Sequence, residues 1–467
     1  MSSLVSVQHI VSPVDGSVLA ERTLADGARI EAVLAAAHAA RRGWVSVPVE
    51  RRAAMVEAMV RHLESQVGEI AVELTRQMGR PVRYTPNEIT RGFQERARHM
   101  ASIAPAGLAQ IQVPRTEGFT KFIRREPVGT VLVVAPWNYP YLTAVNSIVP
   151  ALLAGNTVVL KHASQTMLVA ERLQGAFDAA GLPPGVFQHV QAGHDAIAAM
   201  IADRRIDGVV FTGSVPGGAA IERAAAGRFI GVGTELGGKD PSYVRADADL
   251  PYAIGENVDG AFFNSGQSCC AIERIYVHRD VHDEFVEGFV AATRAYVLAD
   301  PLDPATTIGP MVTAAAAEAV RGQIAEALAA GATALVGERD FAASRPGTAY
   351  LGPTVLVGVE HSMRVMSEES FGPVIGIMPV ADDDEAVARM NDSRYGLTAS
   401  IWTRDVEAAA RIGARVETGT VYANRCDYVD PVLVWTGVKD TGRGIALSSL
   451  GFDPYVRPKS YHLRHPS

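Results

Sequence analysis

The chain has 467 residues, and its 51 acidic side chains exceed its 43 lysines and arginines, which gives a formal net charge of −8. With 48% hydrophobic and 20% charged residues it can bury a sizeable core, so general disorder is excluded. The acidic balance argues against nucleic-acid binding and against a polybasic membrane surface, because both need a surplus of positive charge. The length predicts about three domains, or two large ones.

Only three cysteines occur, two of them adjacent, which is too few for a disulfide framework: Cys269, Cys270 and Cys426. Together with a start that lacks a basic and apolar leader, this predicts a reducing, cytoplasmic setting. The stretch from Pro127 to Leu160 carries no charge, but prolines, asparagines and a glycine interrupt it. We therefore expect a buried strand, helix and strand there, and no membrane span.

In chain order, Pro13 to Gly16 is typical of a turn, and hydrophobic periodicity then predicts helices near residues 27–41, 50–65, 67–79 and 85–104. From residue 130 onward, apolar strands alternate with helices. The strands are expected at 130–135, 157–161, 186–190 and 208–212, and the helices at 141–154 and 165–180. This alternation predicts a parallel, doubly wound, Rossmann-like sheet.

The alternation of helices and strands continues in a second region after about residue 238. Helices are expected at 281–298, 313–330, 384–391 and 405–415, with strands at 350–359 and 372–380. The predicted fold class is therefore α/β, with a Rossmann-like domain and a second α/β domain. Residues 109–127 and the tail from about 451 have the composition of edge strands that await a partner.

A cysteine follows a Gly-Gln turn in the segment Phe-Phe-Asn-Ser-Gly-Gln-Ser-Cys-Cys, residues 262–270. A thiol placed there can reach a cleft and act as a nucleophile if local dipoles or cations lower its pKa. A buried, inert cysteine is the commoner case, and this segment alone leaves that alternative open.

Three further segments carry candidate chemistry. In Thr-Glu-Leu-Gly-Gly-Lys-Asp-Pro, residues 234–241, the glutamate suits a general base or a salt-bridged loop. Residues 211–218 follow a strand and open a helix, as phosphate-binding turns do, although they match neither G-x-G-x-x-G nor a P-loop. In residues 135–140, Asn138 stands at the carboxyl end of a strand, where its amide can donate to an oxyanion.

Over nearly the whole chain, these segments together resemble the aldehyde dehydrogenase superfamily, in that family's order and spacing. The match includes Glu-Glu-Ser-Phe-Gly-Pro at 368–373 and the stretch from Asn391 to Thr398. The resemblance implies a cofactor-binding domain of residues 1–108 and 128–237 and a catalytic domain of residues 238–440. It also implies an oligomerisation flap of residues 109–127 and 451–467, through which family members form a homodimer or homotetramer.

The resemblance also assigns roles. Cys269 is implied to be the nucleophile that forms a thiohemiacetal and then a thioester, with Glu235 as the base that activates the hydrolytic water. The Asn138 side chain and the Cys269 backbone N–H are implied to form the oxyanion hole, and no metal site is implied. Glu235 favours hydrolysis over acyl transfer to coenzyme A. The cofactor, NAD or NADP, is implied to contact Pro136, Trp137, Lys161, Ser164, Gly213, Ser214, Gly237, Glu369 and Phe371.

The chain departs from the family pattern at several places. Ser164 replaces the usual glutamate after Lys161, which removes a repulsion toward a 2′-phosphate and predicts that NADP is at least accepted. The late loop at 434–449 is altered. Polar side chains occupy the expected substrate tunnel and predict a polar aldehyde or a semialdehyde: Tyr139, Asn146, Arg425 and Asp427. The alternative is that Arg425 and Asp427 only pair with each other at the surface.

Two other classes of function were weighed: a cysteine-dependent esterase or hydrolase, and a catalytically silent binding relative. The complete cofactor set argues against the first, and the presence of Cys269, Glu235 and Asn138 argues against the second. The expected partners are a small-molecule aldehyde and further copies of the chain, with neither nucleic acid nor a membrane.

Overall fold

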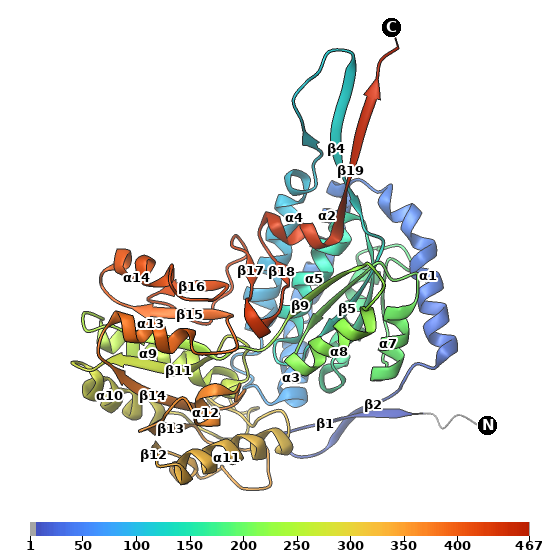
Figure 1. Cartoon of the computed structure of the whole chain (residues 1–467). Coiled ribbons are helices and arrows are strands. Elements are labelled where there is room, and N and C mark those ends of the chain that lie inside the picture. Colours follow the sequence, from blue (N-terminus) through green and yellow to red (C-terminus); the bar gives the residue numbers. More distant parts are fainter. Residues whose placement is uncertain (1–5, 467) are drawn as a thin grey trace.

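A five-stranded parallel sheet forms the first half of the protein, whose computed structural model describes residues 6–466 (Figure 1). The strand order β7-β6-β5-β8-β9 is that of a doubly wound sheet. The prediction of a buried strand, helix and strand from Pro127 to Leu160 is confirmed as β5, α5 and β6. The strands are β5 (Thr130–Ala135), β6 (Thr157–His162), β7 (Phe187–His189), β8 (Gly208–Thr212) and β9 (Gly231–Glu235).

Helices cover both faces of this sheet because successive side chains of a strand point to opposite sides. Val131 and Val133 face one hydrophobic core, while Leu132 and Val134 face another. Helices α2 (Val49–Ser65), α5 (Pro140–Ala154) and α6 (Leu168–Ala179) supply the first core. The second core is supplied by α1 (Gly27–Val45), α7 (His194–Ala202) and α8 (Val215–Ala225).

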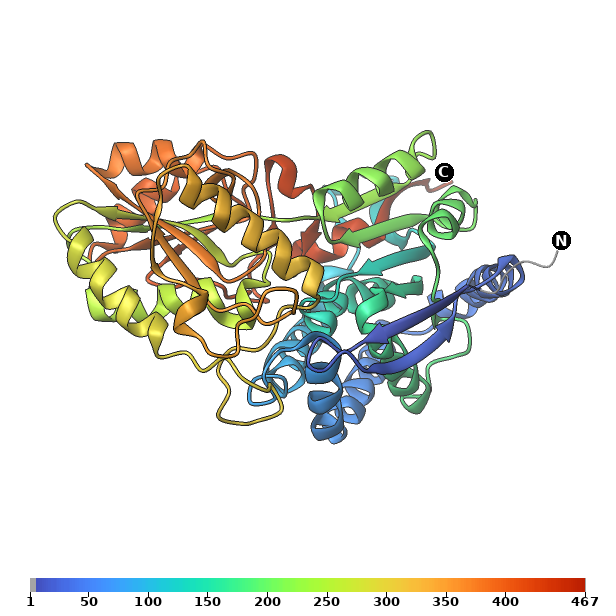
Figure 2. The same cartoon turned by 90° about the horizontal axis from the view of Figure 1, so that it is seen from below.

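The second half holds a seven-stranded sheet in the order β12-β13-β14-β11-β10-β15-β16, parallel except for the outer β12. Figure 2 shows the two sheets with their helices side by side. The strands are β10 (Asp240–Val244), β11 (Ile272–His278), β12 (Thr333–Val336), β13 (Thr354–Val357), β14 (Val374–Val380), β15 (Thr398–Trp402) and β16 (Thr420–Ala423). The helices are α9 (Leu250–Phe262), α10 (His282–Arg294), α11 (Ala314–Ala329), α12 (Arg364–Ser367), α13 (Asp383–Asn391) and α14 (Val406–Gly413).

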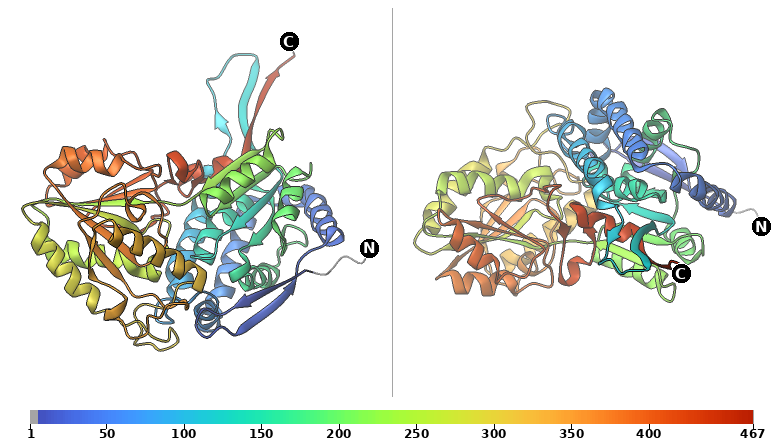
Figure 3. Two further views of the ribbon diagram at one scale, coloured as in Figure 1. Left: turned by 60° about the horizontal axis from the view of Figure 1, so that its bottom comes forward. Right: turned by 90° about the horizontal axis from the view of Figure 1, so that it is seen from above.

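A three-stranded antiparallel sheet projects from the body (Figure 3). It pairs β4 (Phe119–Pro127) with β19 (Val456–Arg464) over nine residue pairs and adds the short β3 (Ile111–Gln112). The two expected edge strands are therefore each other's partners. The segment just before β19 belongs to the body, since Phe452 and Tyr455 are buried in the first core.

Several local expectations differ from the structure. The turn near residue 13 joins an unpredicted hairpin, β1 (Val7–Val11) and β2 (Val18–Thr23). The single helix expected at 85–104 is a π-helical turn, Glu88–Phe93, followed by α4 (Gln94–Gly107). Gly92 lies in that turn, where a Cβ would clash with Leu142 of α5 at 1.9 Å, so close helix approach explains the irregularity. Strand β13 starts later than expected, because Pro353 offers no N–H to a ladder.

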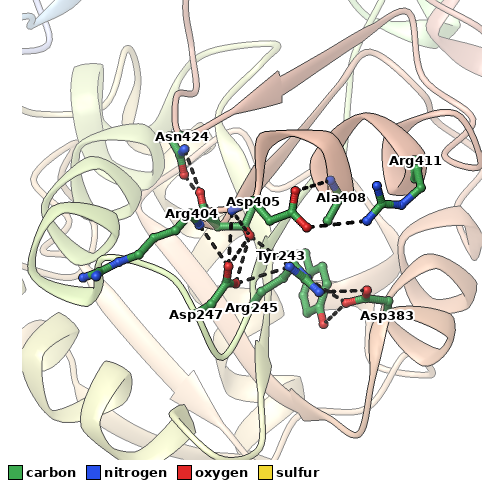
Figure 4. A network of polar contacts seen from close by, with 10 residues as sticks. Tyr243, Arg245, Asp247, Asp383, Arg404, Asp405, Ala408, Arg411 and Asn424 are labelled. Atoms are coloured by element: carbon green, nitrogen blue, oxygen red, sulfur yellow. Dashed lines mark hydrogen bonds and ion pairs between the residues drawn. The ribbon is translucent and has the colours of Figure 1, made fainter.

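Charged residues form a network of hydrogen bonds and ion pairs beyond the carboxyl ends of β10 and β15 (Figure 4). Asp383 accepts hydrogen bonds from Tyr243 Oη at 2.8 Å and from Arg245 Nε at 3.0 Å. Asp247 accepts from the backbone N–H of Arg404 at 3.1 Å. This network lies beyond the carboxyl end of β10, whereas Glu235 and Cys269 precede β10 and β11.

Helices α3 (Val67–Met78) and α2 complete the covering of the first core, and the N-terminal hairpin lies outside it. Within the described residues 6–466, no helix is both long enough and apolar enough to cross a membrane.

Candidate active site

A cavity of about 430 Å³ lies where the carboxyl ends of β5, β8 and β9 meet the start of the seven-stranded sheet. It brings together Cys269, Glu235 and Asn138. All of the predicted cofactor residues except Ser164 also line it. The complete lining is Val134, Ala135, Pro136, Trp137, Asn138, Lys161, Ala163, Phe211, Thr212, Gly213, Ser214, Glu235, Gly237, Cys269, Glu369 and Phe371.

A strained turn presents Cys269 to this cavity. Asn264, Ser265 and Gly266 all have positive φ, 53°, 58° and 70°. A Cβ on Gly266 would approach the carbonyl oxygen of Gly372 to 2.4 Å, so only glycine fits. The Gln267 side chain braces the turn, because its Nε2 donates to the Asn264 carbonyl at 3.0 Å and its Oε1 accepts from the Val312 N–H at 2.8 Å.

The two neighbouring thiols have different surroundings. Cys269 is partly exposed, whereas Cys270 is buried. The Cys270 Sγ donates to Asp427 Oδ1 at 2.9 Å, and Ser268 Oγ donates to the same oxygen at 3.2 Å. Contact with the Cys269 side chain, and then burial, raise the pKa of the Cys270 thiol. Cys270 therefore stays protonated, and Cys269 is the thiol that faces the cavity.

Glu235 ends β9 with its carboxylate at the cavity, and it is only 8% exposed. Burial raises its pKa to about 7, while a hydrogen bond from Thr212 and the charge of Arg96 act in the opposite direction. A carboxyl group with that pKa is divided between its two protonation states near neutral pH, as a general base requires.

Asn138 follows β5 and is held by its backbone. Its carbonyl oxygen accepts hydrogen bonds from the Arg80 guanidinium and from Asn264 Nδ2, the latter at 3.3 Å. Arg80 also forms a buried ion pair with Glu88 and donates to Asn264 Oδ1 at 3.1 Å. One guanidinium thus ties the Asn138 turn to the cysteine turn. The sequence motifs do not reveal Arg80 and Glu88, which lie far from both turns in the chain.

The cofactor half of the cavity is built around the start of α8. Ser214 caps this helix and accepts a hydrogen bond from the Gly217 N–H at 3.3 Å. A Cβ on Gly213 or Gly217 would reach the Phe211 ring at 2.6 Å, so both glycines leave room over the helix start. N–H groups at a helix start, next to such a glycine cradle, fit the pyrophosphate of a dinucleotide.

Glu369 reaches the same half from the seven-stranded side. Its carboxylate accepts a hydrogen bond from the Gly238 N–H at 3.0 Å, and a Cβ on Gly237 would meet it at 2.3 Å. Burial, and then the charge of Glu273, raise the pKa of Glu369 to about 8. The Phe371 ring meets Trp137 edge to face, with centroids 5.6 Å apart. These residues enclose a space suited to a ribose and a flat ring.

A buried ion pair holds the backbone that follows Glu369. Lys239 Nζ lies 2.6 Å from Glu273 Oε2, and both side chains are almost fully buried. Glu273 also accepts from the backbone N–H groups of Ser370 at 2.8 Å and Phe371 at 2.9 Å. The lysine of the Glu-Leu-Gly-Gly-Lys segment is therefore a positioning residue. The sequence analysis missed its partner Glu273, which stands next to Arg274 at the start of β11.

The segment after β6 only partly matches its expected placement. Lys161 and Ala163 line the cavity, whereas Ser164 begins a short 3₁₀ turn beside it. His162 is buried, and its Nε2 lies 3.1 Å from the Pro140 carbonyl oxygen. Burial lowers the pKa of His162 to about 4, so this histidine is neutral and structural.

The four predicted substrate residues lie outside the cavity lining. The Tyr139 ring packs under Arg80, 4.4 Å from the guanidinium carbon. Arg425 is exposed and stacks on the Tyr428 ring at 3.5 Å. Asp427 contacts Cys270 instead, and within residues 6–466 no ion pair joins it to Arg425. The surface pairing considered as an alternative is thus not formed.

Asn146, the fourth, contacts a buried arginine that the sequence analysis missed. Arg96 of α4 is 9% exposed. Its Nη1 donates to the Leu142 carbonyl at 2.7 Å and to Asn146 Oδ1 at 3.3 Å. Within the described part of the chain it forms no ion pair with a carboxylate, although its charge lowers the pKa of Glu235. Arg96 is thus a buried cation for which the described residues supply no ion-pair partner.

Comparison with known proteins identifies the class of enzyme. The family model "Aldehyde dehydrogenase family" matches residues 2–461. The chain therefore belongs to the aldehyde dehydrogenase family, as its motifs predict, and it is an NAD(P)-dependent oxidoreductase.

Two relatives and one solved structure are similar to this chain over almost their whole length. Succinate-semialdehyde dehydrogenase [NADP(+)] of Mycobacterium avium is 33% identical over 457 residues, 96% of this chain and 95% of that protein. Succinate semialdehyde dehydrogenase [NAD(P)+] of Escherichia coli is 34% identical over 447 residues, 95% of each. The structure of succinic semialdehyde dehydrogenase from Streptococcus pyogenes with NADP+ superposes with a TM-score of 0.93 at 29% identity, covering 98% of this chain and 100% of that one.

Proposed function

We propose that the protein oxidises a short aldehyde with an anionic far end, such as a semialdehyde, to the carboxylic acid, and that Cys269, Asn138 and Glu235 carry the reaction. The observation that supports this assignment is the single cavity that contains all three side chains together with Trp137, Ser214, Glu369 and Phe371.

The proposed reaction begins at Cys269. Its thiolate adds to the aldehyde carbon, and the oxyanion so formed is stabilised by the Asn138 amide and the Cys269 backbone N–H. Losing one such donor raises the activation barrier by about 3–4 kcal/mol. A bound cofactor would accept the hydride that leaves this carbon as the oxyanion collapses to a thioester. The resulting thioester on Cys269 is attacked by water, from which the Glu235 carboxylate takes a proton, and the acid leaves as Cys269 is regenerated.

Two observations support a substrate with a negatively charged end. Arg96 offers a buried guanidinium beside Asn146, with its Nε and Nη2 making no hydrogen bond within residues 6–466. Both relatives named above, as well as the superposed structure, carry the name of an enzyme that acts on succinate semialdehyde. We place the substrate carboxylate at Arg96 rather than at the exposed Arg425.

For the cofactor we propose that NADP is accepted and held by Lys161 and Ser164. No carboxylate lines the Lys161 end of the cavity, where Ala163 stands. Burial lowers the pKa of Lys161, and a phosphate group beside it would raise that pKa again.

The test is the absorbance at 340 nm when enzyme and either cofactor are mixed with matched aldehydes, succinate semialdehyde and butanal, which share a four-carbon chain. The proposal expects a kcat/KM for the semialdehyde that exceeds that for butanal by about tenfold or more, since a hydrogen bond to a charged group contributes roughly 1.5–3 kcal/mol. A preference for butanal would contradict the anionic substrate, and absence of reduced cofactor with every aldehyde would favour a hydrolase or a silent relative.

We also propose a homo-oligomer formed through the projecting sheet. Its outer strands β3 and β19 extend beyond the body (Figure 1) and leave strand edges for pairing. Light scattering should give at least twice the chain mass of 49.6 kDa, and a monomer that shortening β19 leaves unchanged would contradict this.

A further inference from the structure

A second, strongly basic cleft lies at the base of the projecting sheet. Its volume is about 760 Å³, and it shares no lining residue with the candidate active site. The ends of α1, α2, α4 and α5 meet β4 and β19 there. One carboxylate, Glu126, stands against six arginines: Arg41, Arg42, Arg52, Arg124, Arg125 and Arg457. In a chain of net charge −8 this is a marked local concentration of positive charge.

Half of these arginines already have anionic partners. Arg41 pairs with Asp207 at 3.0 Å and Arg125 pairs with Asp453 at 3.0 Å. Glu126 is shared between Arg124 at 4.0 Å and Lys459 at 3.3 Å.

The other three guanidinium groups, those of Arg42, Arg52 and Arg457, form no ion pair within residues 6–466. Arg42 and Arg457 are exposed, and they come from α1 and β19, which are distant in the sequence. The cleft therefore has uncompensated positive charge from two different elements, α1 and β19.

Arg52 of α2 is the buried member of the group. It is 8% exposed, and its Nη1 donates to the Val47 carbonyl at 2.8 Å. Its Nε is fully buried and has no hydrogen-bond partner. Burial lowers the pKa of Arg52, with only the charge of Glu50 acting against it. Its Nη2 makes no hydrogen bond within residues 6–466 either, and an anion in the cleft would give this guanidinium a partner.

The start of α2 adds a second set of donors to the same wall. Val47, Pro48 and Val49 line the cleft, and Pro48 stands at the cap position, where no side chain accepts from the first turn. The Arg51 and Arg52 N–H groups bond to the Pro48 carbonyl, which leaves those of Val49 and Glu50 for an anion that the helix dipole favours.

We propose that this cleft binds a small phosphorylated anion with two linked phosphate groups, free pyrophosphate or the diphosphate of a nucleotide. The planar guanidinium of arginine matches phosphate oxygens in pairs, and three uncompensated cations match the charge of a diphosphate. The ligand bridges Arg52 of α2 to Arg457 of β19 and so joins the body to the projecting sheet. This site is separate from aldehyde oxidation and does not depend on the proposed substrate.

Thermal unfolding of the full enzyme tests the proposal. The protein is first saturated with NADP+, so that the phosphate positions of the active site are filled, and no divalent metal is added. With about 10 mM sodium pyrophosphate we expect the unfolding temperature to rise by about 2 °C or more over sodium chloride of equal ionic strength. ADP in a parallel series separates the two sources: a larger rise with ADP assigns a nucleotide, and an equal or smaller one assigns free pyrophosphate. No rise with either ligand overturns the proposal.

Variants locate the effect. The double substitution Arg42→Ser with Arg457→Ser affects exposed side chains, so the fold is retained, and it should abolish the rise. Arg51→Ser removes an exposed arginine of α2 that does not line the cleft and should leave the rise intact. A rise that persists in the double variant, or one that chloride reproduces, means an adventitious ion only. A double variant that changes the oligomeric mass while pyrophosphate has no effect means that a second copy covers the cleft. Either result overturns the proposal, and neither depends on whether the enzyme turns over an aldehyde.

Discussion

Thr212 at the end of β8 donates a hydrogen bond to the carboxylate of Glu235 at the end of the adjacent strand β9, with 3.3 Å between Oγ1 and Oε2. The parallel register places the two side chains side by side at the sheet edge where the cavity opens. This contact, like the charge of Arg96, favours the ionised form of a carboxyl group whose pKa burial raises to about 7.

The first prediction follows from that pKa. Because the base must be ionised, the rate of thioester hydrolysis should fall as the pH drops below about 7. Thr212→Val removes a hydrogen bond to the ionised form, so the midpoint of the profile of kcat against pH should move to higher pH. Thr212→Ser keeps the hydroxyl and should keep the midpoint.

Glu235→Gln completes that experiment. We expect roughly a 10²- to 10⁴-fold loss of kcat, with a stoichiometric burst of reduced cofactor as the thioester accumulates. A variant that loses the burst as well, or one that retains the same pH profile, would show that Glu235 is not the hydrolytic base.

The second prediction concerns Arg96, at which we place the carboxylate of the substrate. Arg96→Gln should lower kcat/KM for succinate semialdehyde about tenfold or more relative to butanal, because it removes a charged hydrogen bond to the carboxylate. The ratio of the two substrates cancels any general loss of active enzyme. Arg96→Lys should restore part of the preference for succinate semialdehyde. In Arg96→Gln the midpoint of the profile of kcat against pH should also move to higher pH, since the Arg96 charge lowers the pKa of Glu235.

Arg425→Ala is the comparison for that prediction. Arg425 is exposed and stacks on Tyr428, so we expect the substrate ratio to change little. If the ratio falls in Arg425→Ala and not in Arg96→Gln, the carboxylate is recognised at the loop and our assignment is wrong.

The contrast between Arg425 and Arg96 illustrates what sequence can reveal. The cysteine turn, the Glu235 segment and the Asn138 turn are local patterns, and the structure brings them into one cavity as expected. Arg96 lies in helix α4, Glu273 in strand β11 and Arg80 just after helix α3, where a charged residue looks the same whether it faces solvent or a buried partner. Their partners Asn146, Asn264 and Lys239 lie dozens to hundreds of residues away. Only the packing of α4 on α5, or of β10 on β11, reveals them.

The fold likewise has parts that local sequence patterns predict and parts that they do not. The alternation of strands and helices predicts the parallel sheet because it is a local signal of apolar, β-branched runs. The N-terminal hairpin of β1 and β2 escapes this reasoning, since its strands are largely exposed and lack a buried face. The late loop around Thr441 is likewise fixed by distant contacts, for example its hydroxyl donating to the Gly237 carbonyl at 2.8 Å.

The third prediction concerns the buried ion pair. Glu273→Gln leaves the Lys239 ammonium buried without a counter-charge, so the free energy of unfolding should fall by about 3–5 kcal/mol. The KM for the cofactor should rise, because Glu273 holds the backbone of Ser370 and Phe371. Urea unfolding measures the first effect. As a control, Glu326→Gln disrupts an exposed pair with Arg364 and should cost about 1 kcal/mol or less. Equal losses in the two variants would contradict the supporting role of Glu273.

The fourth prediction tests cofactor choice at Ser164. The 2′-phosphate of NADP is repelled by a carboxylate near the adenosine ribose, and none stands on this turn. We expect the native enzyme to accept NADP, so a hundredfold preference for NAD would contradict the proposal. Ser164→Glu should lower kcat/KM for NADP by about tenfold or more, the effect of roughly 1.4 kcal/mol between like charges, and should leave NAD nearly unchanged. Ser164→Gln has the same size without the charge and should retain NADP activity. If the two variants behave alike, the effect is steric and Ser164 does not select the cofactor by charge.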